Sequence, residues 1–426
     1  MTIRTFISMI ALSCALAACG GGGGSTQNTS TPAPAAPASA SAPGTASAPL
    51  SASAPTAAST TSTTVPQSTT PNVQAVQVTS TATGTRNMLQ TSVTICVPGT
   101  NNCQTINNIQ VDTGSQGLRV LASALNSSIA LPQVQTASGA GAGECASFGT
   151  GYTWGAVRQA DVRMAGQVAA STSIQVIADS ATGSAPTDCT QSGLPMLNAT
   201  SLRGNGILGV GPFTADCGAG CASTAMPRWY YACNGSSCTN SALAAAQQVT
   251  NPIANFPADN NGVLIELPAV PATGASTVAG TMTFGIGSQA NNLLGSATVL
   301  KSNSLTGYVS TSFSGSAYAS SFIDSGSNGM FFPSTTLTKC GVWYCPATQQ
   351  ALNATINSSS GATTVVAFNV GTSTTLISTG NFAFNNLAGS ANGYFDWGLP
   401  FFFGRRVFTA LEGRVTPAGN GPYYAF

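Results

Sequence analysis

The sequence predicts an all-β protein, and three observations support this fold class. Helical periodicity is rare, short runs rich in Val, Ile, Thr and Phe recur, and Gly, Asn, Ser and Pro bound these runs. The segment 241–249 (SALAAAQQV) is the best candidate for a helix. The strongest strand candidates are 72–81, 92–97, 171–178, 262–268, 281–287 and 363–370.

Residues 1–18 have the pattern of a secretory signal. Arg4 is the positive residue, and the apolar run that follows is too short to span a membrane. The sequence LAAC at 16–19 resembles the lipobox of bacterial lipoproteins, in which the signal is cut before a cysteine that carries lipids. This resemblance implies lipidation of Cys19 and, because Gly20 is not aspartate, an outer-membrane location in the bacterial envelope. An ordinary cleaved signal with an incidental cysteine is the alternative.

The next segment predicts a tether. Residues 20–71 consist largely of Gly, Ser, Thr, Ala and Pro, without a charge or an aromatic ring. Such a composition cannot bury enough apolar surface to offset the entropy of an ordered chain. We therefore expect 19–71 to be a lipidated cysteine followed by a disordered linker.

The composition excludes several kinds of chemistry. The chain has no histidine, 12 Lys+Arg, 11 Asp+Glu and a formal net charge of +1. A Ser-His-Asp triad, a Cys-His dyad and a His-ligated zinc site are therefore impossible. The charge gives no basic patch, so we expect no nucleic acid partner. Proton chemistry would depend on carboxyl groups, tyrosines or thiols.

Ten cysteines follow the signal and Cys19, and they predict five disulfides. An even number of cysteines in an exported chain favours this pairing, whereas zinc, the alternative, lacks a repeated CxxC spacing. Four pairs are close in sequence, and the fifth joins the two cysteines left over. The expected pairs are Cys96/Cys103, Cys145/Cys189, Cys217/Cys221, Cys233/Cys238 and Cys340/Cys345.

Two segments share a pattern that points to chemistry. They read IQVDTGSQGLRV (109–120) and SFIDSGSNGMFF (321–332) and contain Asp112 and Asp324 at matching positions. A single Asp-Thr-Gly is a common turn in which Asp accepts hydrogen bonds from its own backbone. That interpretation does not explain two long copies, each preceded by β-forming residues.

This repeat resembles the paired loops of the pepsin-like aspartic peptidases. The resemblance implies a bilobal double β-barrel with a cleft between an N-terminal lobe (72–288) and a C-terminal lobe (289–426). It covers the chain from about residue 72 to its end, and the chain also resembles a little-characterised family of bacterial lipoproteins of this fold. Further matching segments are the backing strand NGILGVG (205–211), a flap hairpin from Phe148 to Gly155, a joining strand (280–285) and a closing segment (396–408).

The same resemblance assigns roles to residues. Asp112 and Asp324 would form the catalytic dyad, because two adjacent carboxyl groups share one proton and can activate a water without a cofactor or a metal. The implied partner is a polypeptide substrate of a monomeric protein. The supporting residues would be Thr113, Gly114, Ser115, Ser325, Gly326 and Ser327, and the flap would contain Phe148, Gly149, Thr150 and Gly151.

The chain departs from the family pattern near the dyad. Phe148 stands where the flap usually has a tyrosine, and Arg119 stands where its tryptophan partner is expected. Arg119 is either a cleft residue in cation–π contact with Phe148 or a surface arginine at a strand end, and Tyr152 could supply the missing hydroxyl. Asp396 replaces an apolar residue, either raising the pKa values of the dyad or capping a turn.

The other acids are scattered and receive no role, and residues 229–231 (WYY) are expected to pack rather than to bind. The leading hypothesis is an envelope-anchored aspartic endopeptidase. The alternative is a non-catalytic surface lipoprotein of the same fold that binds peptides or glycans. A structural or adhesive envelope protein is a third hypothesis.

Overall fold

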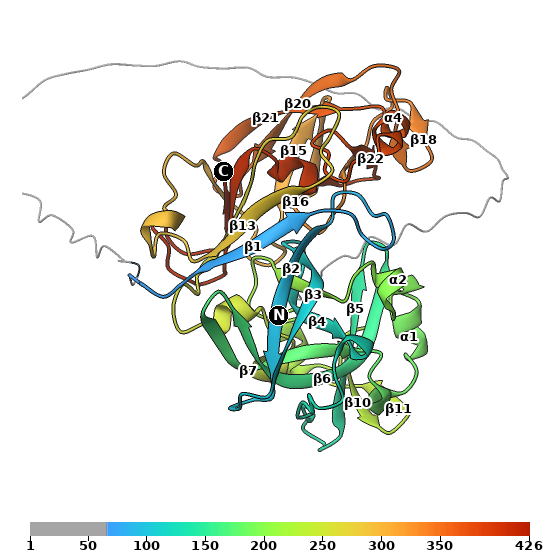
Figure 1. Cartoon of the computed structure of the whole chain (residues 1–426), viewed down its shortest axis with the longest axis vertical. Coiled ribbons are helices and arrows are strands. Elements are labelled where there is room, and N and C mark those ends of the chain that lie inside the picture. Colours follow the sequence, from blue (N-terminus) through green and yellow to red (C-terminus); the bar gives the residue numbers. More distant parts are fainter. Residues whose placement is uncertain (1–64, 66) are drawn as a thin grey trace, which may run out of the picture. The chain divides into compact units, whose positions relative to one another are not determined.

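The structure is a computed structural model that describes Val65 and residues 67–426 (Figure 1). In these residues most of the regular structure is β-strand, so the predicted all-β class is confirmed. Two large sheets dominate the fold. The predicted signal (1–18), Cys19 and most of the predicted tether lie outside the described residues. No helix among the described residues is long and apolar enough to cross a membrane.

The first sheet has sixteen strands in the described part of the chain and includes both chain ends of that part. Its strands are β1 (Val73–Val78), β2 (Leu89–Cys96), β3 (Cys103–Asp112), β4 (Gln116–Leu121), β5 (Gly141–Phe148), β6 (Gly151–Met164), β7 (Gln167–Ile177), β8 (Leu194–Pro195), β9 (Gly206–Val210), β10 (Tyr230–Asn234), β11 (Ser237–Asn240), β12 (Gly262–Leu267), β13 (Val278–Phe284), β14 (Val299–Lys301), β24 (Arg405–Ala410) and β25 (Tyr423–Ala425).

Six of these strands close into a barrel. The pairing runs β2–β3–β9–β4–β7–β6 and returns from β6 to β2. Apolar residues that alternate along these strands, such as Val93, Ile109 and Leu118, are buried in the core. This alternation is the period-2 geometry of strands, in which successive side chains point to opposite faces.

The second sheet has nine strands in the described residues and forms an open path from β18 to β21. It is rich in aromatic packing, with Phe395 stacked against both Phe332 and Trp397. Its strands are β15 (Val309–Phe313), β16 (Ser316–Ile323), β17 (Met330–Phe332), β18 (Lys339–Cys340), β19 (Trp343–Tyr344), β20 (Gln350–Asn357), β21 (Thr363–Val370), β22 (Ala388–Ser390) and β23 (Phe395–Trp397).

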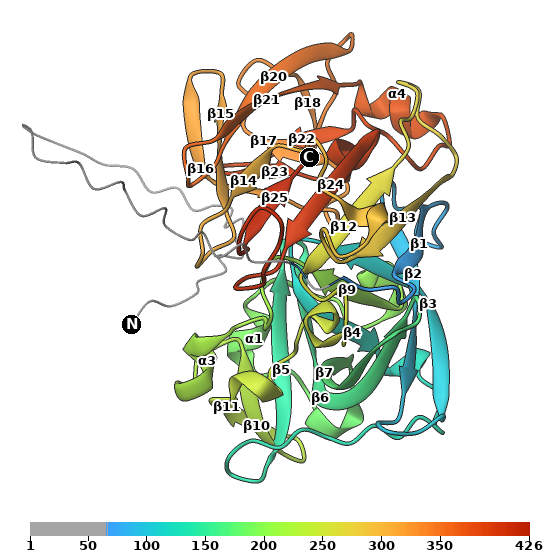
Figure 2. The same cartoon turned by 90° about the vertical axis from the view of Figure 1, so that its left-hand side faces the viewer.

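Strands from distant parts of the sequence join the barrel to the second half of the chain. The order β1–β13–β12–β24–β25–β14 extends the first sheet beyond the barrel (Figure 2). The expected joining strand at 280–285 is part of β13, which pairs with β1 and β12. Since β24, β25 and β14 belong to the segment 289–426, both predicted lobes contribute strands here.

Helices in the described residues are short. They are α1 (Thr187–Thr190), α2 (Ala199–Leu202), α3 (Ala219–Ser223), α4 (Ser373–Ser378) and six 3₁₀ turns, η1 (Ala122–Ala124), η2 (Ser180–Thr182), η3 (Ala245–Gln247), η4 (Pro252–Asn255), η5 (Ala290–Asn292) and η6 (Leu399–Phe402).

The predicted helix at 241–249 is wrong, because only η3 forms there. The backbone N–H groups of Ser241 and Leu243 donate to Tyr230 and Cys221 instead. The side chain of Gln248 makes buried hydrogen bonds to Gly218 and Leu243. Tertiary contacts thus override the helix propensity of the alanines.

The folded part begins before residue 72. The Gln67 side chain donates to the Gly287 carbonyl at 3.0 Å, and the Ser68 N–H donates to the Ser288 carbonyl at 3.1 Å. The Gln289 side chain donates to the Thr70 carbonyl at 2.7 Å. The assignment of 67–71 to the tether is therefore wrong: one side chain and two backbone groups of this segment have partners on the folded part.

All five predicted disulfides are present, and the zinc alternative is wrong for these cysteines because their sulfurs are bonded in pairs. The described residues contain no cluster of His, Cys, Asp and Glu that could hold a metal ion. Five disulfides fit a protein that folds outside the cytoplasm.

Candidate active site

The two Asp-[Thr/Ser]-Gly-Ser loops have the same local structure. Asp112 ends β3, and Asp324 follows β16 directly. In the first loop Gly114 N–H donates to Asp112 Oδ1 at 2.8 Å, and the Ser115 hydroxyl donates to Oδ2. In the second loop Gly326 N–H donates to Asp324 Oδ1 at 2.7 Å, and the Ser327 hydroxyl donates to Oδ2 at 2.8 Å. Each carboxyl group is therefore held by donors from its own loop.

The residues after the aspartates join the two loops. Thr113 Oγ1 donates to the Ile323 carbonyl at 2.9 Å, and Ser325 Oγ donates to the Val111 carbonyl at 2.9 Å. The same hydroxyls accept from backbone N–H groups, Thr113 Oγ1 from Ser325 at 2.9 Å and Ser325 Oγ from Thr113 at 3.1 Å. This reciprocal pairing is buried and fixes one loop against the other.

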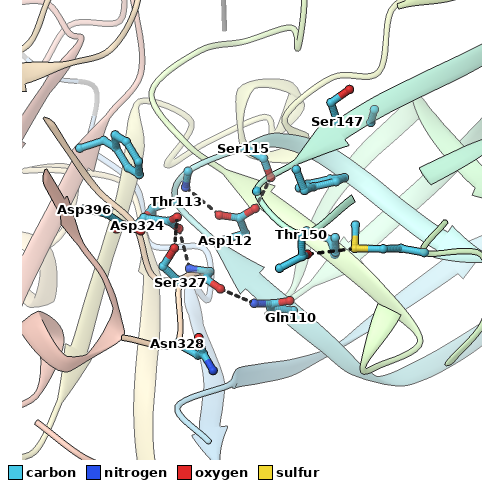
Figure 3. A pocket seen from close by; sticks show the side chains of 18 of the residues that line it. Gln110, Asp112, Thr113, Ser115, Ser147, Thr150, Asp324, Ser327, Asn328 and Asp396 are labelled. Carbon is cyan, nitrogen blue, oxygen red and sulfur yellow. Dashed lines mark hydrogen bonds between the residues drawn. The ribbon is translucent and has the colours of Figure 1, made fainter. Parts of the chain in front are cut away.

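One cross-link was not predicted. Gln110 Nε2 donates to the Gly326 carbonyl at 2.6 Å, so a side chain of β3 also holds the second loop (Figure 3). The sequence offers no signal for this bond, since a glutamine two residues before an aspartate is an ordinary exposed strand residue.

The two carboxyl groups meet between the loops. Figure 3 shows them next to each other, and a hydrogen bond to Asp112 is among the causes that raise the pKa of Asp324. A Cβ added at Gly114 would lie 2.7 Å from Asp324 Cγ, and one at Gly326 would lie 2.5 Å from Asp112 Oδ1. Because glycine has no Cβ, the carboxyl group of the opposite loop can occupy the space beside it.

Burial and the neighbouring charge favour a proton on Asp324. Desolvation, followed by the charge of Asp112 and the hydrogen bond to it, raises the pKa of Asp324 well above its ordinary value. Ser327 and Gly326 oppose this shift by donating hydrogen bonds to the carboxylate. The pair can therefore hold one proton between two carboxyl groups.

Each loop is backed by a strand from elsewhere in the chain. Strand β9 lies parallel to β3, with Gly209 level with Asp112. Strand β23 lies parallel to β16, with Trp397 level with Ile323 and hence Gly398 level with Asp324. The expected strand at 205–211 therefore lies beside the first loop, and the start of the segment 396–408 lies beside the second.

Asp396 is the exception to this symmetry. It lies one residue before Trp397, in the place that Ile207 has before Leu208. Its side chain is buried, so its interpretation as a turn aspartate is wrong. Burial, followed by the charge of Asp324, raises the pKa of Asp396 well above its ordinary value, although Ser327 opposes this through a hydrogen bond.

A cavity of about 880 Å³ opens over the dyad. Both aspartates line it, together with Gly149 and Thr150 from the predicted flap and Ser147 directly before it. The flap is a hairpin of β5 and β6, in which Phe148 pairs with Gly151. Phe148 also lines the cavity, and Gly151, directly after the turn, pairs with Leu194 of β8, so β8 holds the hairpin close to its tip.

The predicted role of Tyr152 as a cleft hydroxyl is wrong. Its side chain packs in a cluster with Trp154, Tyr231 and the Cys145–Cys189 disulfide, and it does not line the cavity. The reason is the alternation of side chains along β6, which turns this residue toward the disulfide. Tyr152 therefore does not supply the hydroxyl that the flap lacks at Phe148.

Arg119 is a buried cleft residue, and its interpretation as a surface arginine is wrong. It is only 2% exposed and lies 5.8 Å from the centre of the Phe148 ring, so the expected cation–π contact is present. Its guanidinium donates to Glu144 at 2.5 Å and to Asp216 at 3.1 Å. Two carboxyl groups therefore compensate the charge of Arg119 locally.

Glu144 and Asp216 received no role from the sequence, because nothing local marks them. Glu144 is fully buried, and burial raises its pKa well above the ordinary value, with Arg119 opposing and Asp216 reinforcing the shift. Asp216 also accepts from the Tyr230 hydroxyl at 2.5 Å. Tyr230 and Tyr231 are buried, as expected for a packed segment, whereas Trp229 lines the cavity.

We expect the folded state to lose stability as the pH rises above about 4. Asp324, Asp396 and Glu144 have pKa values raised above their ordinary values of 3.8, 3.8 and 4.5. The folded state therefore binds these protons more tightly than the unfolded state, and the stabilisation is lost as the pH rises through the folded pKa values. Asp188 has the opposite effect. Burial raises its pKa, but hydrogen bonds, of which that from Tyr231 is the strongest, lower it overall, so its stabilisation is lost as the pH falls below 3.8.

The measurement is the thermal midpoint between pH 4 and pH 8. It should fall with rising pH in the wild type and fall less in Asp396→Asn, which cannot ionise at this position. Equal slopes for the two proteins would contradict the assignment of a raised pKa to Asp396.

The comparisons with known proteins identify the family of the chain. Residues 68–426 match a family described as a protein of unknown function (DUF3443), and the chain belongs to this family. No curated protein matches the sequence.

Proposed function

We propose that this DUF3443 protein is an aspartic endopeptidase in which a water activated between Asp112 and Asp324 hydrolyses peptide bonds. The observation that carries the proposal is the contact of two carboxyl groups from matching loops at a cavity. This chemistry requires two carboxyl groups that share one proton, and two carboxyl groups far apart could not share it. The resemblance to pepsin-like aspartic peptidases supports the same assignment.

The mechanism assigns a role to each carboxyl group. Asp324 holds the proton, because burial and the charge of Asp112 raise its pKa. Asp112 takes a proton from water, whose oxygen attacks the peptide carbonyl carbon while Asp324 gives its proton to the carbonyl oxygen. A hydroxyl of the resulting diol returns a proton to Asp324 as the diol collapses, the C–N bond breaks, and Asp112 gives its proton to the amine nitrogen. One water is consumed, and the dyad returns to its singly protonated state.

The flap is proposed to cover an extended polypeptide. Phe148 and Thr150 at the hairpin tip line the cavity opposite the dyad loops. Phe148 cannot donate a hydrogen bond, so the flap would contribute apolar contact and exclusion of water.

The same proposal locates the enzyme in the bacterial envelope as an outer-membrane lipoprotein. The support is the lipobox-like LAAC at 16–19 together with five disulfides. Radiolabelled fatty acid should be incorporated into the wild type and not into Cys19→Ser. Absence of label from the wild type would contradict the anchor.

The proposed activity is tested with purified protein and an unfolded polypeptide between pH 3 and pH 7. We expect internal cleavage that pepstatin inhibits. Gly326→Ala should reduce the rate by about 10²-fold, because the new Cβ would displace Asp112, whereas Gly220→Ala has open space and should cleave at the wild-type rate. Both variants should be checked for folding by thermal melting. Absence of cleavage at every pH, or normal cleavage by folded Gly326→Ala, would overturn the proposal.

A second candidate function is peptide or glycan binding without catalysis. The observation that favours it is the absence of a flap hydroxyl at Phe148, together with the failure of Tyr152 to supply one. Calorimetry with peptides and oligosaccharides separates the two functions: saturable binding without any cleavage would favour the binding protein.

A further inference from the structure

The cavity is asymmetric at two equivalent positions. Ile207 of β9 pairs with Arg119 of β4, and Asp396 of β23 pairs with Phe331 of β17. Both Ile207 and Asp396 line the cavity. The wall beside the first loop therefore has an isoleucine where the wall beside the second loop has a carboxyl group.

The carboxyl group of Asp396 has an unused acceptor. The residue is 4% exposed, and its Oδ1 has no hydrogen-bond partner among the described residues. The Ser327 hydroxyl is a hydrogen-bonding neighbour of Asp396 but also donates to Asp324 Oδ2 at 2.8 Å. A buried acceptor without a donor is unfavourable, so a ligand that brings a donor to this carboxyl group would gain affinity there.

Aromatic rings surround this carboxyl group in the same wall. Phe322 and Tyr394 are stacked, with ring centroids 6.0 Å apart, and Tyr308 lies 5.7 Å from Phe322. All three line the cavity with Asp396. The pKa of Tyr394 is raised by burial and then by the charge of Asp396, which indicates that the two side chains interact. Ring faces beside a carboxylate attract a cation.

The charges of the cavity favour the same class of ligand. After burial, the charges of Asp324 and Asp112 raise the pKa of Asp396. In the described part of the chain, no basic side chain is among the charges that shift this pKa. Arg119 is paired with Glu144 and Asp216. Arg203 and Arg228 also line the cavity, but neither is among the charges that shift the pKa of Asp396, so the charges that act on this carboxyl group are acidic.

We propose that Asp396, with Tyr394 and Phe322, forms a subsite for a lysine or arginine side chain of the polypeptide beside the bond that is cut. This inference rests on the proposed peptidase function and adds a substrate class to it. The ammonium or guanidinium group would pair with the carboxyl group of Asp396 and lie against the rings. Ile207, at the equivalent position of the other wall, would leave its side selective for apolar groups.

The first test compares cleavage of peptides that differ only by Lys or Met at the residue on either side of the cut. The wild type should prefer Lys by about tenfold in kcat/KM. Asp396→Ile, which copies the equivalent position, should lose this preference or reverse it, and Asp396→Asn should weaken it. The control Glu266→Gln, at an exposed ion pair with Arg406, should keep it.

The second test uses binding, so that it does not depend on cleavage. Titration of the wild type with the Lys and Met peptides should show tighter binding of the Lys peptide, and Asp396→Ile should bind both equally. If no peptide is cut but this pattern holds, the peptidase function fails and the subsite stands. If peptides are cut or bound without a preference for Lys, or folded Asp396→Ile keeps that preference, the subsite is overturned.

Discussion

The Asp324→Asn variant should lose about 10²- to 10⁴-fold in kcat/KM for cleavage of an unfolded polypeptide. Asparagine keeps the size of the side chain and can still accept the hydrogen bond from Gly326 N–H. It cannot take part in proton transfer, whereas burial and the charge of Asp112 raise the pKa of Asp324 and so favour its protonated form. The loss should fall on kcat rather than KM, because the variant changes the proton transfer and leaves the cavity in place.

Rates and thermal midpoints measured together decide this prediction. The folded state should survive, since a neutral side chain removes the cost of a buried ionised carboxyl group. Glu266→Gln, far from the loops on an exposed ion pair, serves as the control and should cleave like the wild type. If Asp324→Asn retained more than about a tenth of the wild-type rate, the two-carboxyl mechanism would be excluded.

The Arg119→Met variant should lower the free energy of unfolding by about 3–5 kcal/mol at pH 7. Glu144 and Asp216 would then remain in a buried site without the cation that both contact. Methionine fills much of the volume of the arginine stem, so the missing charge should account for most of the loss. The contact with Phe148 at the flap would also disappear.

Denaturant unfolding at two pH values tests this expectation. The loss should be smaller at pH 4, because the raised pKa of Glu144 favours its neutral form there. The matched control is Arg406→Met, whose partner Glu266 is 36% exposed and which should cost at most about 1 kcal/mol. An equally small effect of Arg119→Met would mean that the buried cluster does not need its cation.

Local patterns in the sequence were enough to predict the strands and the dyad loops. Short runs of Val, Ile, Thr and Phe bounded by Gly, Asn, Ser and Pro indicate strands, and the Asp-[Thr/Ser]-Gly-Ser turns are formed by neighbours in sequence. Four of the disulfides join cysteines that are seven residues apart or fewer, which explains why their pairing could be read directly.

The predictions that were wrong concerned side chains whose neighbours come from distant segments. The sequence leaves two interpretations of Arg119 open, because its carboxylate partners lie far away in the sequence, on β5 and in the segment before α3. Tyr152 was assigned to the cleft, but the Cys145–Cys189 disulfide and Trp154 draw it into another cluster. The helix at 241–249 was replaced by backbone bonds to β10 and α3.

The sequence by itself determined the all-β class, the five cysteine pairs and the two aspartate loops, because these depend on residue spacing and on short-range hydrogen bonds. Only the tertiary structure decided that each carboxyl group lies against the opposite loop, that Arg119 is paired with carboxyl groups in the interior, and that Asp396 is buried with an unpartnered oxygen. The physical reason is that burial and charge compensation depend on which strands become neighbours. That register is fixed by packing across the whole chain, and a single sequence does not display it.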